Sequence, residues 1–353
     1  MSLTRTLLRS PAVAALTSPH GIDRYLELLH PLWTVHEVRA EVTGIRHETA
    51  DVATLTLRPT DTWRGHRAGQ FVQLGVEIDG VRRTRCFSIS SSEHRRDAFT
   101  VTVRAHDEGL VSRHLVRAAR PGTVVHLSQA EGGFTLPDPR PQRLVMVSGG
   151  SGITPVMAML RTLVDEGYDG RVTFLHYSQR PETTIYRDEL DLLAGHPSVD
   201  LTVVHTRHGG ERFTPDALTA LAPDAADVDA YACGPAGLVE LVGEAYADGP
   251  DRLRVEYFKT STLRPDPSTA EGTVTFARSG RSAENTGATL LEQAEAAGLS
   301  PEYGCRMGIC FTCTARRREG STRNVVTGAE SSLPDEDVQL CVSTPLGDCV
   351  VDV

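Results

Sequence analysis

Four cysteines near the C-terminus constrain this chain more than any other feature. Cys305, Cys310 and Cys313 are separated by four and then two residues, and Cys341 follows further along the chain. This Cys-x4-Cys-x2-Cys…Cys spacing is typical of chains that ligate a 2Fe-2S cluster with four thiolates. Gly308, between the first two cysteines, provides the conformational freedom that a loop around a cluster requires. The spacing therefore predicts a site that carries single electrons.

A zinc site or a pair of disulfides is the alternative interpretation of these cysteines. Zinc sites more often contain two Cys-x2-Cys pairs, and only one pair has that spacing here. The other cysteines, Cys86, Cys233 and Cys349, lie far apart in the sequence and suggest no disulfide framework, which indicates a reducing cytoplasm. Because the spacing resembles that of plant-type ferredoxins, we favour the iron-sulfur interpretation.

Length and charge limit what the rest of the chain can be. With 353 residues, the chain is long enough for two or three domains, each with its own core. A net charge of -10 argues against a nucleic-acid partner, which would require a basic face. The acidic C-terminal part is instead suited to docking a basic protein.

We expect the first 35 residues to form two short helices ahead of the first domain. Apolar residues recur at helical spacing between residues 22 and 29, and Pro31 ends that run. Pro11 interrupts the apolar residues nearer the start, so neither a signal peptide nor a membrane span is predicted. One hypothesis is that this extension packs on the next domain. The other is that residues 1–30 touch a membrane surface or a membrane-bound electron acceptor, which would place the cytoplasmic protein peripherally at a membrane.

From residue 36 the pattern changes to short strands with glycines between them. Such strands at close spacing predict a small antiparallel barrel. We expect them at residues 40–45, 52–57, 70–74, 86–89 and 99–103.

The sequence Arg85-Cys86-Phe87-Ser88 indicates what the barrel binds. It resembles the Arg-x-Tyr-Ser signature of the ferredoxin-NADP reductase family, whose barrel binds flavin. The resemblance implies that Arg85 neutralises the flavin phosphate, that Phe87 packs on the isoalloxazine and that Ser88 lies near flavin N5. Phe87 departs from the usual tyrosine, so the stacking is retained but the hydroxyl contact is lost.

Two further segments resemble flavin-binding elements of the same family. In relatives, amides at the start of a helix receive the pyrophosphate, and the matching helix here is expected to begin at Ser112. A glycine loop then closes the barrel near the flavin. The residues implicated in these two elements are Gly109, Leu110, Val111, Ser112, Gly133 and Phe134.

The next domain is expected to bind a nicotinamide dinucleotide. A continuous apolar strand at residues 143–147 runs into Ser-Gly-Gly-Ser-Gly-Ile-Thr-Pro and then into an apolar helix at 156–160. Glycines let the phosphate approach the backbone, and a helix N-terminus attracts its charge. The alternative is a tight structural turn. The residues that we expect to form this cradle are Gly149, Gly150, Gly152, Thr154 and Pro155.

Strands at residues 172–177, 201–204 and 230–233 would complete a doubly wound sheet. The last of them ends in Cys233-Gly234-Pro235, which matches the Cys-Gly-Pro that the family places beside the nicotinamide. The resemblance implies that Cys233 shapes the hydride-transfer pocket without acting as a nucleophile. It also implies that Glu256, in the final strand, reaches back toward the flavin.

The choice of coenzyme depends on charge around the adenosine ribose. NADPH carries an extra phosphate that favours arginine, whereas NADH offers hydroxyl groups that usually meet a carboxylate. Thr206 and Arg207 fall where NADP-using relatives place Ser-Arg, Tyr186 lies in a segment resembling the one with their adenine-stacking tyrosine, and Arg180 is nearby in sequence. These residues favour NADPH, with NADH as the alternative.

The remaining residues resemble a beta-grasp ferredoxin. We expect strands at 272–276 and 349–353 and a helix at 289–294. The predicted fold is therefore a flavin-binding antiparallel barrel, a doubly wound α/β domain and an α+β ferredoxin. The predicted boundaries are 1–35 for the extension, 36–138 for the FAD barrel, 139–258 for the NAD(P) domain, 259–270 for a linker and 271–353 for the 2Fe-2S domain.

This architecture resembles the electron-transfer reductases of oxygenases and desaturases. It implies that NADPH reduces FAD, that FAD reduces the 2Fe-2S cluster and that the cluster reduces a terminal non-haem iron oxygenase or a membrane acyl desaturase. The arm at residues 19–25 resembles that of actinobacterial acyl-CoA desaturase reductases. Two alternatives remain. One is an NADH- and FMN-using reductase of a ring-hydroxylating dioxygenase, and the other is a redox sensor or binding protein without turnover.

Overall fold

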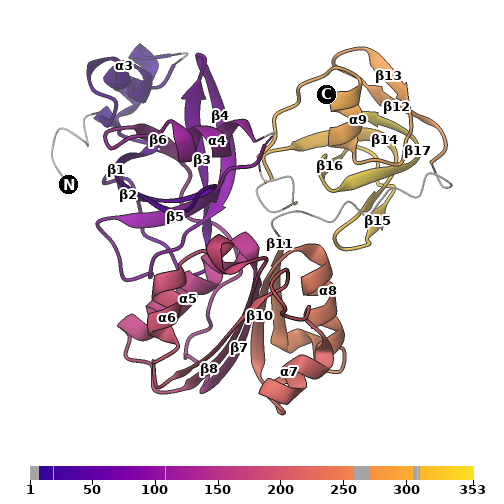
Figure 1. Ribbon diagram of the computed structural model, residues 1–353. Coiled ribbons are helices and arrows are strands. Elements are labelled where there is room, and N and C mark those ends of the chain that lie inside the picture. The colour runs from indigo at the N-terminus through magenta and orange to yellow at the C-terminus, as the bar shows by residue number, and fades with distance from the viewer. Residues whose placement is uncertain (1–7, 19, 108, 258–269, 305–307, 309–310) are drawn as a thin grey trace. The chain divides into compact units, whose positions relative to one another are not determined.

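The computed structural model describes residues 8–18, 20–107, 109–257, 270–304, 308 and 311–353 (Figure 1). The chain divides into two compact units. One comprises Met1–Gly234 with Leu238–Glu256, and the other comprises Pro235–Gly237 with Tyr257–Val353. Two of the residues predicted to ligate the cluster, Cys305 and Cys310, lie outside the described residues, as do residues 259–269 of the predicted linker and residues 1–7 of the extension.

The N-terminal extension forms two short helices, α2 (Pro11–Leu16) and α3 (Ile22–Leu29). Arg39, a fully buried residue of the first barrel strand, donates through Nη1 to the carbonyl of Pro31 at 2.7 Å and pairs through Nη2 with Glu27 of α3 at 3.3 Å. The extension is therefore attached to the barrel by polar contacts.

The first domain is an antiparallel barrel of six strands. The sheet order is β4-β3-β6-β1-β2-β5, and its outer strands meet at a bridge between Ile89 and Val101, which closes the sheet. The strands carry inward-facing apolar residues at alternate positions, as the period of two predicts. The strand β6 was not predicted. The elements of this domain are β1 (Val38–Thr49), β2 (Val52–Pro59), β3 (Phe71–Ile78), β4 (Val81–Ser88), β5 (Phe99–Arg104), α4 (Leu110–Arg117) and β6 (Val124–Leu127).

The second domain is a doubly wound sheet with the order β11-β10-β7-β8-β9. Figure 1 shows α5 and α6 on one side of this sheet and α7 and α8 on the other. The order reverses between β7 and β10, so the loops after these two parallel strands meet at the switch point, where such sheets bind ligands. The elements are β7 (Arg143–Gly149), η1 (Gly150–Gly152), α5 (Ile153–Asp165), β8 (Arg171–Ser178), η2 (Pro181–Thr183), α6 (Arg187–Leu193), β9 (Val199–His205), α7 (Pro215–Leu221), η3 (Ala225–Asp227), β10 (Asp229–Gly234), α8 (Ala236–Ala245), η4 (Pro250–Arg252) and β11 (Leu253–Tyr257).

The C-terminal domain packs one helix on a mixed sheet. Leu290, Leu291 and Ala294 of the helix share a core with apolar residues of the two central strands. The final strand is longer than predicted, because it begins at Ser343. The elements are β12 (Thr273–Phe276), β13 (Arg281–Glu284), α9 (Leu290–Ala296), β14 (Thr314–Asn324), β15 (Glu330–Ser331), β16 (Glu336–Gln339) and β17 (Ser343–Val351).

These three domains confirm the predicted fold class of barrel, doubly wound sheet and ferredoxin-type domain. Among the helices that the structure describes, none is both long and apolar enough to cross a lipid bilayer.

Candidate active site and cofactor sites

Three predicted residues come from separate segments of the larger unit and form one buried group. Ser88 ends β4, Cys233 lies near the end of β10 and Glu256 lies in β11. The hydroxyl of Ser88 donates to Oε2 of Glu256 over 3.5 Å, and all three side chains are buried. The structure thus brings Ser88 of the barrel and Glu256 of the sheet together.

Burial changes the charge state of this group. It raises the pKa of Glu256 to about 8, although the Ser88 hydroxyl opposes the shift. Burial raises the pKa of the Cys233 thiol well above its usual value, and the ionised form of Glu256 raises it further. At pH 7 the Cys233 thiol is therefore protonated, and Glu256 is largely protonated.

Glu256→Gln should remove a pH dependence of stability. The folded pKa of about 8 exceeds the ordinary value of 4.5, so the folded state binds more protons between these values, and stability falls as pH rises through this window. We expect the flavin-loaded wild type to lose about 3–5 kcal/mol of unfolding free energy across it. Unfolding measured from pH 5 to pH 9 should give a flatter profile for the glutamine variant, and parallel profiles would contradict the shift.

The glycine loop after β7 forms a cradle that excludes side chains. A Cβ at Gly152 would lie 2.2 Å from the carbonyl oxygen of Cys233, and one at Gly234 would lie 2.9 Å from the amide nitrogen of Gly149. Gly150 has a φ of 57°, which favours glycine. The two loops at the switch point therefore pack backbone against backbone.

A helix of thirteen residues, α5, starts directly after this loop. Thr154, in its first turn, donates through Oγ1 to the carbonyl of Ser151 at 3.0 Å, and Pro155 is buried beside it. Exposed amides at the start of such a helix favour an anion. The loop thus fits the pyrophosphate of a nicotinamide dinucleotide, and Gly149, Gly150, Gly152, Thr154 and Pro155 would hold it.

Sequence reasoning missed Arg104, which ends the barrel strand β5. Its Nη1 lies 3.5 Å from the position that a Cβ at Gly150 would take, so this arginine of the barrel faces the glycine loop of the other domain. Its Nε lies 3.3 Å from Asp51. A cation in this position would attract the dinucleotide phosphates. In the sequence, the indication of this role was an arginine at the end of a strand that has no other charged residue.

The residues predicted to bind the flavin in the barrel lie on strand β4. Phe87 is half-buried and packs against the barrel core, and Cys86 next to it is also half-buried. Arg85 donates to the carbonyl of Thr84 at 2.7 Å from a partly exposed position. An aromatic face and a guanidinium thus lie on the strand that delivers Ser88 to the site, which fits an isoalloxazine and a phosphate.

The predicted pyrophosphate helix begins earlier than expected. The helix α4 starts at Leu110 with Gly109 as its N-cap, whereas the sequence prediction started it at Ser112. The reason is that the Ser112 hydroxyl turns back and donates to the Gly109 carbonyl at 3.1 Å, which supports the first turn from within. A Cβ at Gly109 would lie 2.3 Å from Ser112 Oγ, so a larger residue here would displace that hydroxyl. The helix-start amides are therefore those following Gly109, around Leu110 and Val111.

Two aromatic residues predicted to bind cofactors are buried in the seam between the domains. Tyr186 is 2% exposed, its hydroxyl donates to Thr102 of the barrel, and Arg161 lies 4.6 Å above its ring. Tyr186 is therefore enclosed by residues of both domains, and its stacking on adenine stays a prediction. The ring of Phe134 packs edge-on against that of Tyr231, with 5.4 Å between the ring centroids. Gly133 is exposed, and its contact with the flavin stays a prediction.

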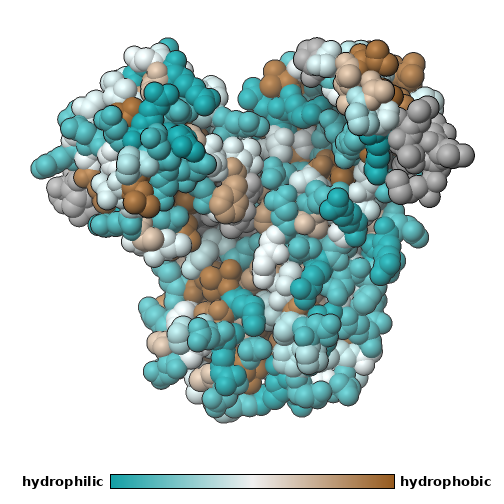
Figure 2. Space-filling model, turned by 180° about the vertical axis from the view of Figure 1, so that it is seen from behind, coloured by the Kyte–Doolittle hydropathy of each residue, from teal (hydrophilic) through white to brown (hydrophobic). Residues whose placement is uncertain are grey.

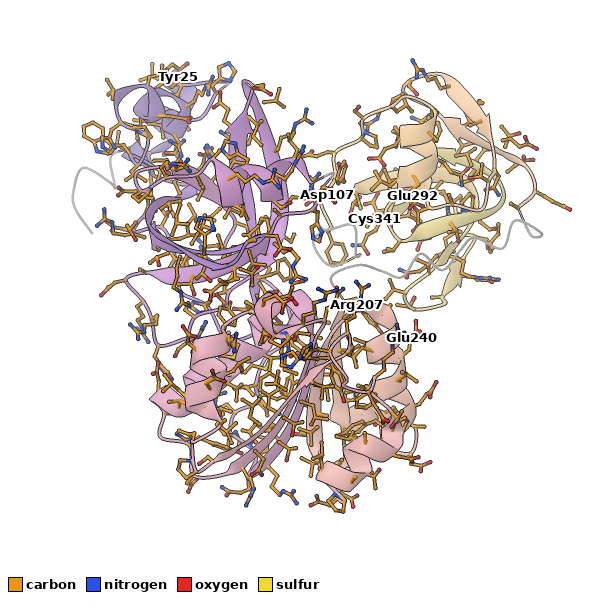
Figure 3. All side chains as sticks on the ribbon, in the orientation of Figure 1. Tyr25, Asp107, Arg207, Glu240, Glu292 and Cys341 are labelled. Atoms are coloured by element: carbon orange, nitrogen blue, oxygen red, sulfur yellow. The ribbon has the colours of Figure 1, made fainter. Side chains whose placement is uncertain are left out.

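The residues predicted to select the coenzyme lie at neighbouring strand ends. The amide of Thr206 donates to Ser178 at 2.9 Å, and that of Arg207 donates to Gln179 at 2.8 Å, which brings them beside Arg180. The side chains of Arg180 and Arg207 are exposed, and Arg207 is labelled in Figure 3. This edge therefore presents two guanidinium groups that could meet a ribose phosphate.

The cluster site is described through two of its four cysteines. Cys313 and Cys341 are 3% and 5% exposed, and the amide of Leu340 donates to the carbonyl of Cys313 at 3.1 Å, which links their two segments. Gly308 has a φ of 76°, and a Cβ there would lie 3.0 Å from Val342, so a side chain would not fit. Two buried thiols and a glycine with positive φ fit a 2Fe-2S cluster, which all four cysteines would hold.

Three family models match the chain in order. The model described as Oxidoreductase FAD-binding domain matches residues 39–135, Oxidoreductase NAD-binding domain matches 146–244, and 2Fe-2S iron-sulfur cluster binding domain matches 274–346. The matches define an NAD(P)H-dependent oxidoreductase with FAD and a 2Fe-2S cluster as its cofactors.

Relatives and solved structures resemble the chain over nearly its full length. An NADPH oxidoreductase of Mycobacterium tuberculosis is 40% identical over 96% of this chain and 90% of that protein. A stachydrine N-demethylase reductase subunit of Rhizobium meliloti is 31% identical over 85% of this chain and 92% of that protein. The structure of phthalate dioxygenase reductase matches with a TM-score of 0.62 at 22% identity, covering 89% of this chain and 97% of that one. The chain belongs to the ferredoxin-NADP reductase family, in the arrangement with a C-terminal 2Fe-2S domain.

Proposed function

We propose that this protein passes electrons from NADPH to a terminal non-haem iron oxygenase or to a membrane acyl desaturase. The observation that carries the proposal is the buried group of Ser88, Cys233 and Glu256 at the switch point of a chain that also holds a 2Fe-2S domain. Relatives support an oxygenase acceptor, because one is a glycine betaine monooxygenase reductase subunit of Pseudomonas aeruginosa, 29% identical over 81% of this chain.

The chain's own residues would place and shield the reacting groups. When bound, FAD accepts a hydride and returns single electrons, which the cluster carries onward. Ser88 would offer its hydroxyl at the flavin edge, with Glu256 holding that hydroxyl in place. Cys233 would form an uncharged wall beside the nicotinamide, because its thiol is protonated at pH 7, and Glu256 is largely protonated there as well. The buried group thus excludes water and charge from the transfer path.

The central experiment is turnover with a one-electron acceptor. NADPH should drive continuous reduction of cytochrome c by the loaded protein, with a rate that persists over many equivalents. A redox sensor would instead bleach after one equivalent and stop. To distinguish an oxygenase from a desaturase as the acceptor, each purified acceptor is offered in turn as the sole electron acceptor. The physiological acceptor should form its product at a rate coupled to NADPH oxidation.

Arg207→Ala should weaken the preference for NADPH. The exposed guanidinium at the end of β9 would contact the ribose phosphate, which NADH lacks. Loss of one such contact should raise the KM for NADPH about tenfold and leave the KM for NADH within about twofold. Arg212→Ala, which removes an exposed arginine further along the same loop, serves as the control.

Equal effects of Arg207→Ala on both coenzymes would favour the NADH alternative. That alternative has its own support, because an NADH oxidoreductase of Escherichia coli is 29% identical over 89% of this chain. Identifying the flavin extracted from the protein distinguishes the proposed FAD enzyme from an FMN-using ring-hydroxylating reductase.

A further inference from the structure

The second N-terminal helix buries an aspartate and leaves several large apolar side chains exposed. Asp23 is the buried residue of α3, and its carboxylate accepts hydrogen bonds from the amides of Val35, His36 and Glu37 at 2.6–2.8 Å. The hydroxyl of Thr34 adds a fourth at 2.9 Å. These bonds hold the pKa of the Asp23 carboxyl below its ordinary value despite burial. The carboxylate therefore fixes which face of α3 meets the barrel.

Because Asp23 faces inward, the large apolar side chains of the extension face solvent. The helix α2 has no buried residue among those described, and Leu28 and Leu29 of α3 are 77% and 74% exposed. Figure 2 shows hydrophobic residues gathered on the extension at the upper right, and Tyr25 is labelled on α3 in Figure 3. We call this set the leucine face, and its members are Leu16, Tyr25, Leu28, Leu29 and Trp33.

Charge on the extension favours an anionic partner. Its two described carboxylates are both compensated, since Asp23 is buried under four donors and Glu27 pairs with Arg39 at 3.3 Å. Arg24 is 66% exposed on the same helix, and its Nη1 lies 3.7 Å from Oε2 of Glu27. The side chains of His20 and His30, near it in sequence, are also exposed. The extension thus presents exposed apolar side chains and an exposed guanidinium on a chain whose net charge is -10.

We propose that the leucine face binds the surface of a lipid bilayer that contains anionic phospholipid. Leucines bury apolar area among acyl chains, and tryptophan and tyrosine lie at the headgroup level. Arg24 adds attraction to anionic headgroups. Since the rest of the acidic chain is repelled by such a surface, the extension also orients the protein on it. This inference concerns binding only and does not depend on electron transfer.

Vesicle co-sedimentation of the flavin- and cluster-loaded full chain tests the proposal. The probe is phosphatidylcholine vesicles with about a fifth phosphatidylglycerol. Leu28→Ser with Leu29→Ser should lower the partition coefficient by about tenfold or more. The matched control is Leu192→Ser with Leu221→Ser, which changes two exposed leucines of α6 and α7 and should partition like the wild type. Unchanged NADPH-ferricyanide turnover of both variants would show that they remain folded.

Trp33 gives a second readout. It is 55% exposed, and the only other tryptophan of the chain, Trp63, stacks on Phe99 in the barrel. In a Trp63→Phe background, emission from Trp33 should shift to the blue when vesicles are added. The proposal would be overturned if the wild type failed to bind vesicles or if both double variants bound them equally. It would also be overturned if the protein formed a dimer that dissociated only in the Leu28→Ser, Leu29→Ser variant. The last result would assign the leucine face to a second copy of the chain.

Discussion

Cys341→Ser is expected to abolish reduction of cytochrome c while FAD is still reduced by NADPH. Cys341 is buried in the C-terminal domain beside the segment of Cys313, and its thiolate would be one of four cluster ligands (Figure 3). Substituting a residue that only hydrogen-bonds to a metal ligand typically lowers activity or metal affinity by roughly 10–100-fold. Removing a ligand itself should cost more, so we expect the rate of cytochrome c reduction to fall by about a hundredfold or more. Stopped-flow absorbance of the flavin and steady-state cytochrome c reduction measure the two steps separately.

Cys349→Ser is the matched control for this substitution. Cys349 is equally buried in the same domain, and burial raises the pKa of its thiol to about 11, but it lies outside the cluster spacing. The control variant should keep its cluster absorbance and its turnover. If Cys341→Ser lost flavin reduction and cytochrome c reduction to the same degree, while remaining folded and yellow, the separation into two steps would be wrong.

Gly152→Ala is expected to disable the coenzyme site. The added Cβ would lie 2.2 Å from the carbonyl oxygen of Cys233, so the glycine loop and the end of β10 would have to move apart. A displacement of about 1 Å at a reacting centre costs about a hundredfold in rate. We expect flavin reduction by NADPH to slow on that scale, and reduction of the protein by dithionite to be unaffected.

Gly243→Ala separates this steric effect from a general effect of alanine. Gly243 lies in α8, and a Cβ there meets nothing within 4 Å. Alanine is also the better helix former, so the control variant should be at least as stable as the wild type. Normal flavin reduction by Gly152→Ala would show that the close approach of the two loops is not required.

The strands and the principal loops were predictable because their signals are local. Alternating apolar residues marked five barrel strands, and a buried strand followed by glycines marked the dinucleotide loop. The strand β6 was not predicted because it has only four residues, too few to show a clear alternating pattern. The start of α4 was misplaced because serine is a common N-cap, whereas Ser112 here bonds backward within the first turn.

The side-chain environment at the seam between barrel and sheet depends on contacts that sequence spacing does not reveal. The sequence did not show that Thr102 and Arg161 from distant segments enclose Tyr186. Arg104 looked like an ordinary strand end, but the fold brings it to Gly150. The inward position of Asp23 likewise depends on amides of the segment that follows the helix. Each of these requires the tertiary structure.

Electron paramagnetic resonance of the protein after anaerobic addition of NADPH tests the central claim most directly. That claim is that one chain takes hydride at the Ser88–Glu256 site and delivers single electrons through its 2Fe-2S domain. The account predicts a reduced-cluster signal that appears with NADPH in the wild type and is absent in Cys341→Ser, in which the flavin is still bleached. A wild-type cluster that remained oxidised while the flavin was fully reduced would contradict it.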